Sequence, residues 1–146
     1  EFPSSASAMP AGTIRFDNGA LPVRFVSVHT TSPTAQSWDL WRKSLTEMQQ
    51  LTARTGTQYV LMGDFNATYD HAVFRDLLGS RFQDAARASG HGLVFSWPAD
   101  KPWLPAFSGI DHIVTERGVV VGQVSTMRIG GSDHRALLAT LDFTRR

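Results

Sequence analysis

Acidic, amide and histidine side chains occur at the ends of predicted strands, at widely separated points in the sequence. Asp64 and Asn66 directly follow an apolar run at residues 59–62, within the stretch "YVLMGDFNATYD". Further along, Asp111 lies inside an apolar strand pattern, and Asp133-His134 precedes the last predicted strand in the glycine-rich stretch "GGSDHRAL". Carboxylates that bind a divalent ion, a histidine that accepts a proton and N–H donors are what phosphoryl hydrolysis requires.

The chemistry of each side chain indicates a role in such a site. Asp64 and Asp133 are candidate oxygen ligands of a metal ion or activators of water. The amide of Asn66 is suited to donate to a phosphate oxygen. His134 is a candidate general base, oriented by a buried carboxylate such as Asp111. His29, at the end of its strand, could also donate to phosphate.

Each of these residues also has a structural interpretation when it is taken alone. Asp64 and Asn66 are common turn residues, and a histidine such as His29 at a strand end is commonly structural. Asp111 could be an exposed acid of an edge strand, and Asp70-His71 is more typical of a helix cap than of a site. The functional interpretation depends on these residues occurring together.

The remaining pattern predicts an α/β chain. Ser32-Pro33 is a helix-start signal, and Trp38, Trp41, Leu45, Met48 and Leu51 would form the buried face of a helix that Gly56 ends. The segment 71–79 is predicted to be a second, short helix. Strands are predicted at 21–30, 58–62, 110–115, 119–127 and 136–143, so that the C-terminal part is largely antiparallel.

Composition narrows the function classes. The chain has 146 residues, a net charge of +1 and no cysteine. That size allows one domain, and the weak charge gives no strong field for nucleic acid or an anionic membrane. Disulfides, thiolate metal sites and a cysteine nucleophile are excluded. No apolar run is long enough to span a bilayer, and residues 1–20 are predicted to be a flexible lead-in, with a cloning remnant as one interpretation of its start.

Taken in order, the motifs "VSVHTTSP", "GDFNATYD", "FSWPAD", "GIDHIV" and "GGSDHRAL" resemble the endonuclease/exonuclease/phosphatase superfamily, which includes DNase I-like nucleases. The resemblance covers most of the chain, from Val23 to Phe143, and is strongest to a bacterial membrane-anchored branch that includes teicoplanin-resistance proteins. Tyr69 stands where many relatives have proline.

This resemblance implies a fold and roles for the site residues. The fold would be the C-terminal half, residues 21–146, of a four-layered α/β/β/α sandwich, with one mostly antiparallel sheet and flanking helices. Asp64 and Asn66 would position water and phosphate, Asp111 would pair with His134, and Asp133 would lie by the metal. His29 would contact phosphate. The cofactor implied is Mg²⁺, with Mn²⁺ as an alternative.

The family's first half, which carries a metal-binding glutamate, has no counterpart in these residues. A half-sandwich would expose an apolar sheet face, so we expect that half or a second copy of the chain to cover it. The resemblance also implies a membrane-anchored parent with this domain extracytoplasmic, and a chain that is itself soluble.

Three functions stay open at this point. The first is part of a Mg²⁺-dependent phosphohydrolase acting on a lipid-linked or small phosphoester or pyrophosphate, with the isolated chain inactive. The second is a nuclease, and the third is a non-catalytic fragment that self-associates or binds a partner.

Overall fold

The protein is described by a computed structural model that covers residues 2–5, 8–17, 19–53 and 56–143. The strands are β1 (Ala11–Ile14), β2 (Val23–His29), β3 (Gln58–Asp64), β4 (Phe82–Asp84), β5 (Asp111–Glu116), β6 (Val120–Arg128) and β7 (Arg135–Asp142). The helices in these ranges are α1 (Trp38–Thr52), α2 (Ala72–Leu78) and α3 (Ala85–Ala88).

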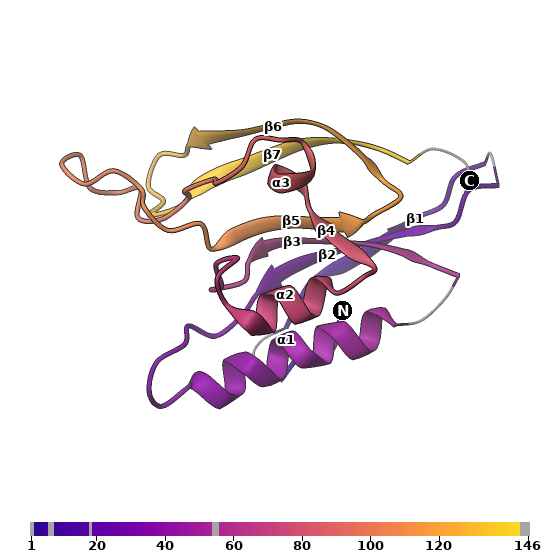
Figure 1. The fold of residues 1–146 in the computed structure, drawn as a ribbon, viewed down its shortest axis with the longest axis horizontal. Coiled ribbons are helices and arrows are strands. Elements are labelled where there is room, and N and C mark those ends of the chain that lie inside the picture. Colours follow the sequence, from indigo (N-terminus) through magenta and orange to yellow (C-terminus); the bar gives the residue numbers. More distant parts are fainter. Residues whose placement is uncertain (1, 6–7, 18, 54–55, 144–146) are drawn as a thin grey trace.

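Five strands form the central sheet in the order β1-β2-β3-β5-β4, and β6 and β7 form a separate antiparallel hairpin (Figure 1). Only the β2–β3 pair of the central sheet is parallel, because helix α1 connects these two strands. Strands β2 and β3 therefore end at the same edge of the sheet, and β5, which is antiparallel to β3, begins there. The predicted α/β fold class with flanking helices is confirmed; the strands predicted at 119–127 and 136–143 form a hairpin of their own instead of joining the central sheet.

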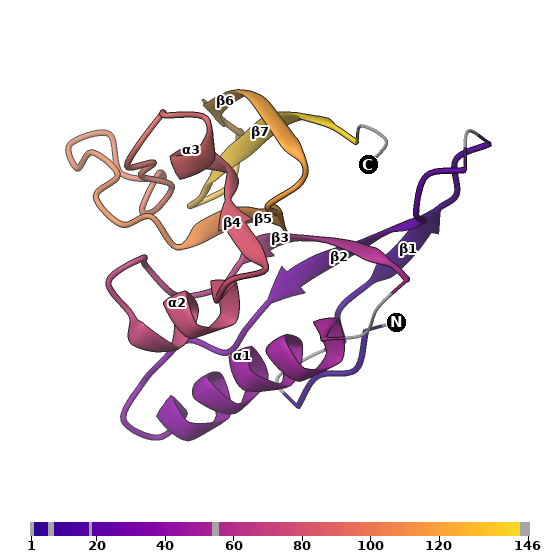
Figure 2. The same ribbon diagram turned by 45° about the vertical axis from the view of Figure 1, so that its right-hand side comes forward.

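Helices α1 and α2 cover one face of the central sheet (Figure 2). The α1 side chains Trp41, Leu45 and Met48 are fully buried, as the helical spacing predicts. They share one core cluster with Leu61 of β3 and Phe74 of α2. Trp38 of the predicted stripe is 43% exposed, and the side chain of Leu51 lies outside the described residues.

The β6–β7 hairpin lies over the other face of the sheet (Figure 1). A second core cluster joins Val23, Val60 and Ile113 of the central sheet to Val124 of β6. The hairpin therefore covers part of the apolar sheet face that was predicted to need a partner. Apolar side chains of the hairpin itself are exposed, among them Val120 (55%) and Leu138 (45%).

Three local predictions are wrong. Helix α1 begins at Trp38 with Ser37 as its N-cap, because the Ser32 hydroxyl donates instead to the side chain of Asn66. At the other end the helix stops at Thr52, before Gly56. The His71 side chain, expected to cap α2, makes no capping bond and accepts a hydrogen bond from the Thr68 N–H at 2.9 Å.

The predicted lead-in, residues 1–20, contains ordered structure. β1 pairs with β2, and Phe2 and Met9 are buried in the core, where they form a bridge with each other. Phe2 and Met9 are isolated apolar residues in the sequence, so they gave no strand signal there, although both are buried in the structure. Residues 1, 6–7 and 18 of this range lie outside the described residues.

Candidate active site

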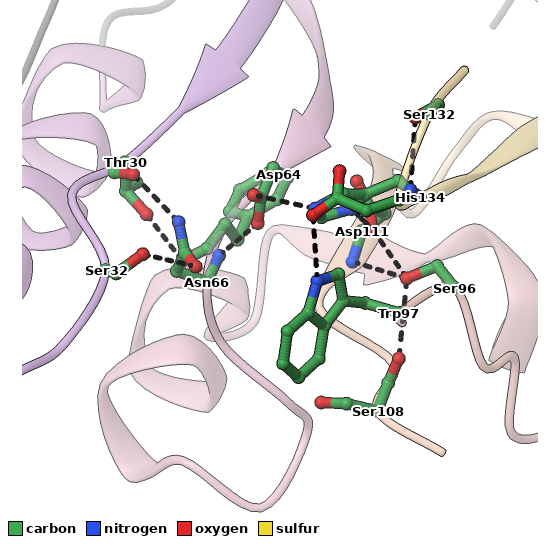
Figure 3. Close-up of polar contacts among 12 residues, drawn as sticks. Thr30, Ser32, Asp64, Asn66, Ser96, Trp97, Ser108, Asp111, Ser132 and His134 are labelled. Carbon is green, nitrogen blue, oxygen red and sulfur yellow. Dashed lines mark hydrogen bonds and ion pairs between the residues drawn. The ribbon is translucent and has the colours of Figure 1, made fainter. Parts of the chain in front are cut away.

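The sequence-predicted side chains gather where β2 and β3 end and β5 and β7 begin (Figure 3). Asp64 is the last residue of β3, Asp111 is the first of β5, and they are register partners across that pair. His134 directly precedes β7 and its ring reaches toward both carboxylates. The sheet topology thus brings residues 70 positions apart in the sequence, Asp64 and His134, to one edge.

The turn after β3 is built by two unusual backbone conformations. Gly63 has φ 138°, and a Cβ atom there would lie 2.2 Å from the Val28 carbonyl oxygen of β2. Asn66 has φ 46°, a left-handed conformation that asparagine tolerates better than most residues. Its N–H donates to the Asp64 carboxylate at 2.7 Å, which fixes that side chain.

The Asn66 side chain is held by the segment after β2. Its amide N–H donates to the Thr30 carbonyl at 2.8 Å, and its carbonyl accepts from the Ser32 hydroxyl at 3.2 Å (Figure 3). An amide NH₂ has two hydrogens, and the described contact uses one of them. Asn66 is therefore positioned with a second N–H for an oxygen-rich ligand.

His134 and Asp111 form a hydrogen-bonded pair. The Asp111 Oδ2 lies 2.8 Å from Nδ1 of His134 and also accepts from the Ser96 hydroxyl at 2.5 Å. With Nδ1 engaged, Nε2 is the ring nitrogen directed at Asp64, 3.9 Å from its Oδ2. This is the geometry of a histidine base oriented by a carboxylate.

Burial and neighbouring charges shift the pKa values of this cluster. Burial alone would lower the pKa of His134, but the hydrogen bond and charge of Asp111, with the charges of Asp64 and Asp133, raise it above its ordinary value. Burial is the main cause that raises the pKa of Asp64. The Asn66 N–H opposes this shift, the Asp111 charge adds to it, and the His134 and His29 charges oppose it.

Asp64, Asp111 and His134 also form a group with the donor chemistry of a metal site. One candidate ligand atom of each lies within 4.8 Å of the others. Asp111 Oδ2 is bonded to His134 and Ser96, and Asp64 Oδ1 accepts from the Asn66 N–H, so each carboxylate has one oxygen engaged in these contacts. Hard carboxylate oxygens fit Mg²⁺ or Mn²⁺, so the residues present suit a divalent ion.

The two other predicted residues lie at the margin of this cluster. His29, the last residue of β2, is exposed and is the register partner of Asp64. Asp133 is exposed and its carboxylate accepts from the indole N–H of Trp97 at 3.3 Å. Asp133 contributes charge near His134 but is not a member of the Asp64–Asp111–His134 group.

The sequence interpretation missed the residues that support this site. Ser96 and Trp97 belong to the "FSWPAD" motif, yet only the structure shows that they bind Asp111 and Asp133. Thr30 holds Asn66 through its backbone carbonyl, a group that carries no sequence signal.

A second histidine–aspartate pair lies on the other side of β5. His112 is 7% exposed, its Nδ1 lies 2.5 Å from the Asp84 carboxylate, and its Nε2 lies 2.7 Å from the Ala67 carbonyl. Asp84 in addition caps α3 by accepting from the N–H groups of Ala86 and Arg87. This buried pair ties the loop after Asn66 to β5 and α3.

The described glutamates are engaged elsewhere. Glu47 contacts Lys43 and Ser5, and Glu116 forms a salt bridge with Arg81 at 2.6 Å. As expected from the sequence, neither belongs to the acidic group at the sheet edge.

The family model described as "Endonuclease/Exonuclease/phosphatase family" matches residues 5–134. The chain belongs to this family. Hydrolases of the endonuclease/exonuclease/phosphatase family are metal-dependent phosphoesterases, in agreement with the chemistry of the cluster. No curated protein matches the chain by sequence.

Solved structures of family members share the fold at low sequence identity. A mannosyl-6-phosphatase from Bacteroides thetaiotaomicron has 17% identity and a TM-score of 0.67, with 91% of this chain and 56% of that chain covered. A humanised TDP2 from D. rerio has 16% identity and a TM-score of 0.69, with 90% and 59% covered. The human Nocturnin catalytic domain has 20% identity and a TM-score of 0.64, with 92% and 52% covered.

The chain therefore spans little more than half the length of these structures. Within the described ranges, none of the helices has the length and hydropathy required to cross a bilayer.

Proposed function

We propose that this chain forms the C-terminal part of a metal-dependent phosphohydrolase that cleaves a phosphoester or pyrophosphate by attack of water. The observation that carries the proposal is the orientation of His134, whose Nδ1 is bonded to Asp111 at 2.8 Å while Nε2 faces Asp64 at 3.9 Å. Family membership supports the reaction class.

The side chains have distinct tasks in this proposal. Asp111, held by Ser96, keeps Nδ1 of His134 protonated, so that Nε2 is free to take a proton from water or to donate to a phosphate oxygen. Asp64 orients the water, and the free N–H of Asn66 donates to the phosphate. His29 and Asp133 lie at the margin, where they add a donor and negative charge. A divalent ion bound by Asp64, with Asp133 nearby, would supply neutralisation of phosphate charge.

A lipid-linked or small-molecule substrate is favoured over nucleic acid. The net charge of +1 gives no extended field for a polyanion. The "GDFNATYD" and "GGSDHRAL" motifs resemble the membrane-anchored branch, so we assign the parent protein to that branch, with an extracytoplasmic domain as part of the proposal.

The remaining part of the domain, or a second copy of this chain, is proposed to cover the exposed apolar side chains of β6 and β7. The structural relatives are longer, and Val120 and Leu138 are exposed on the hairpin. Light scattering of the isolated chain at micromolar concentration tests this point. A strictly monomeric mass, without the rest of the domain present, would contradict association through a second copy.

The function is tested in the protein that contains this chain together with the rest of its domain. Phosphate release from a lipid pyrophosphate and from a small phosphomonoester is compared with plasmid nicking, each with Mg²⁺ and with chelator. We expect phosphate release that needs the ion and His134. Salt-dependent nicking alone would identify a nuclease instead, and no turnover of any substrate would support a non-catalytic role.

A further inference from the structure

A cavity of about 190 Å³ lies beside the His134–Asp111 pair. The loop that follows Asn66 contributes Thr68 and Tyr69 to its lining, and residues 92–95 and Phe107 line it as well. Asp111 lines the cavity and also binds His134, so the cavity and the candidate active site share a residue.

The cavity is mostly apolar at its mouth. Leu93 (72% exposed), Phe95 (45%) and Phe107 (55%) line it although their side chains are largely in contact with solvent. Tyr69 adds a ring, which lies beneath the Arg87 guanidinium at 3.8 Å from the ring centroid. Aromatic and aliphatic groups exposed together around a hollow mark a binding surface more often than a packing fault.

The buried pair Asp84–His112 lines the cavity with its hydrogen bonds already made, and Asp70, Arg87 and Asp111 line it as well. Asp84 and His112 are 6% and 7% exposed and bind each other. The Asp84 carboxylate also accepts from two α3 N–H groups, and the remaining His112 nitrogen faces the Ala67 carbonyl. Since Asp84 and His112 have their partners, an apolar group that enters the cavity leaves neither of them unsatisfied.

The size of the cavity also limits its occupant. Protein interiors rarely leave voids much larger than a water molecule, and an apolar cavity of roughly 150 Å³ accommodates benzene. The 190 Å³ cavity therefore holds a group of about the size of one aromatic ring. Tyr69, Phe95 and Phe107 offer ring edges and faces for such a group.

The larger groove between α1 and α2, about 470 Å³, does not compete for this role. Its lining contains no member of the Asp64–Asp111–His134 group, whereas Asp111 lines the smaller cavity.

We propose that the cavity lined by Phe95, Phe107 and Asp111 binds an apolar, ring-sized group of the substrate next to its phosphate. The proposal rests on the proposed function, because it places the phosphate at Asn66 and His134. It specifies the substrate class as phosphoesters whose organic part is apolar close to the phosphate.

The test compares three probes on the chain by NMR titration with Mg²⁺: inorganic phosphate, phenyl phosphate and phenol. We expect phenyl phosphate to bind about tenfold more tightly than inorganic phosphate, because the ring is removed from water. Phenol alone is expected to shift the methyl resonances of Val94 and Leu137, which line the cavity.

Variants at the mouth of the cavity sharpen this test. Leu93→Asp places a carboxylate among the apolar groups at a solvent-exposed position, and Phe107→Ala removes one wall. Both are expected to abolish the advantage of phenyl phosphate and to leave binding of inorganic phosphate unchanged. Trp103→Ala is the matched control, since Trp103 is 77% exposed in the same loop but does not line the cavity.

The outcomes separate this proposal from the proposed function. Equal affinity for phenyl phosphate and inorganic phosphate would overturn the apolar subsite and leave the phosphohydrolase proposal standing. Phenol shifts at Val94 and Leu137 without any binding of inorganic phosphate would support the cavity and count against the phosphate site. No response to either phenyl phosphate or phenol would overturn the subsite.

Discussion

The two histidine–aspartate pairs of β5 have similar chemistry and different surroundings. Asp111 and His112 are consecutive residues, so their side chains point to opposite faces of the strand. Asp111 binds His134, which is half-buried, and His112 binds Asp84 in the core.

The difference lies in the second ring nitrogen. In His112, Nε2 faces the Ala67 carbonyl at 2.7 Å, so the ring is held on both sides and acts as a brace. In His134, Nε2 is directed toward Asp64, 3.9 Å away, a separation longer than a hydrogen bond. A carboxylate partner is thus common to both histidines, and the role proposed for His134 depends on the Nε2 that has no hydrogen-bonded partner within the described residues.

The largest effect is expected for His134→Gln, measured as phosphate release by the protein that carries the complete domain. We expect the rate to fall by about 10²–10⁴, because the general base is lost while the size of the side chain is kept. Thermal unfolding should change little.

The matched control for that variant is His91→Gln, at an exposed loop position outside the cluster. Full activity of His134→Gln would remove His134 from the site.

For His112→Phe we expect a loss of stability instead of a loss of activity. The free energy of unfolding should fall by about 3–5 kcal/mol, because the Asp84 charge is left buried without its partner. Urea unfolding measures the change. Adding Asp84→Asn keeps an acceptor for the α3 N–H groups and removes the charge, so the double variant should be more stable than His112→Phe alone. A double variant less stable than the single one would show that the charge is not the cause.

A smaller effect is expected for Asp111→Asn on the pKa of His134. Burial lowers this pKa, and the hydrogen bond and charge of Asp111, together with the charges of Asp64 and Asp133, more than offset it, so the pKa should fall when the Asp111 charge is removed. NMR titration of the His134 ring measures the shift. An unchanged midpoint would contradict the assigned pairing.

The same pKa shift has a consequence for stability. Because the folded pKa of His134 lies above its ordinary value of 6.5, its contribution to stability is present below that pH and is lost as pH rises through the folded value. Asp111→Asn should therefore lose more stability at acidic pH than at alkaline pH.

The smallest effect is expected for Asp64→Asn, as a rise in Tm of the order of 2 °C near neutral pH. The raised pKa of Asp64, caused mainly by burial, means that its charged form is disfavoured in the folded chain. An asparagine can still accept from the Asn66 N–H. Calorimetry without added metal measures the change, and a clear fall in Tm would show that the charge stabilises the fold.

The sequence predicted the residues of the candidate site better than the residues that hold them in place. Asp64, Asn66, Asp111 and His134 stand at strand ends, and strand pairing brings such positions to one edge. The brace at His112 was not predicted, because "DH" at 111–112 and "DH" at 133–134 look alike locally. Only the pairing of β5 with β3 and β4 decides which face each side chain occupies.

The late start of α1 has a similar cause. Ser32-Pro33 carries a valid helix-start signal, but the Ser32 hydroxyl and Thr30 carbonyl are used by Asn66, 34 residues or more away in sequence. Local propensity cannot anticipate a distant partner. The strand β1 was missed for the same reason, since it depends on β2 for its hydrogen bonds.

Gly63 is a position of β3 where the backbone leaves no space for a side chain. Its φ of 138° and the 2.2 Å approach of a hypothetical Cβ to the Val28 oxygen leave no room for a methyl group, and the two residues are register partners in neighbouring strands. In a saturation library of β3, position 63 should accept only glycine, because of the backbone and not because of its side-chain chemistry. Directed evolution of the proposed phosphohydrolase would therefore have to explore the loops around the cavity and leave this position unchanged.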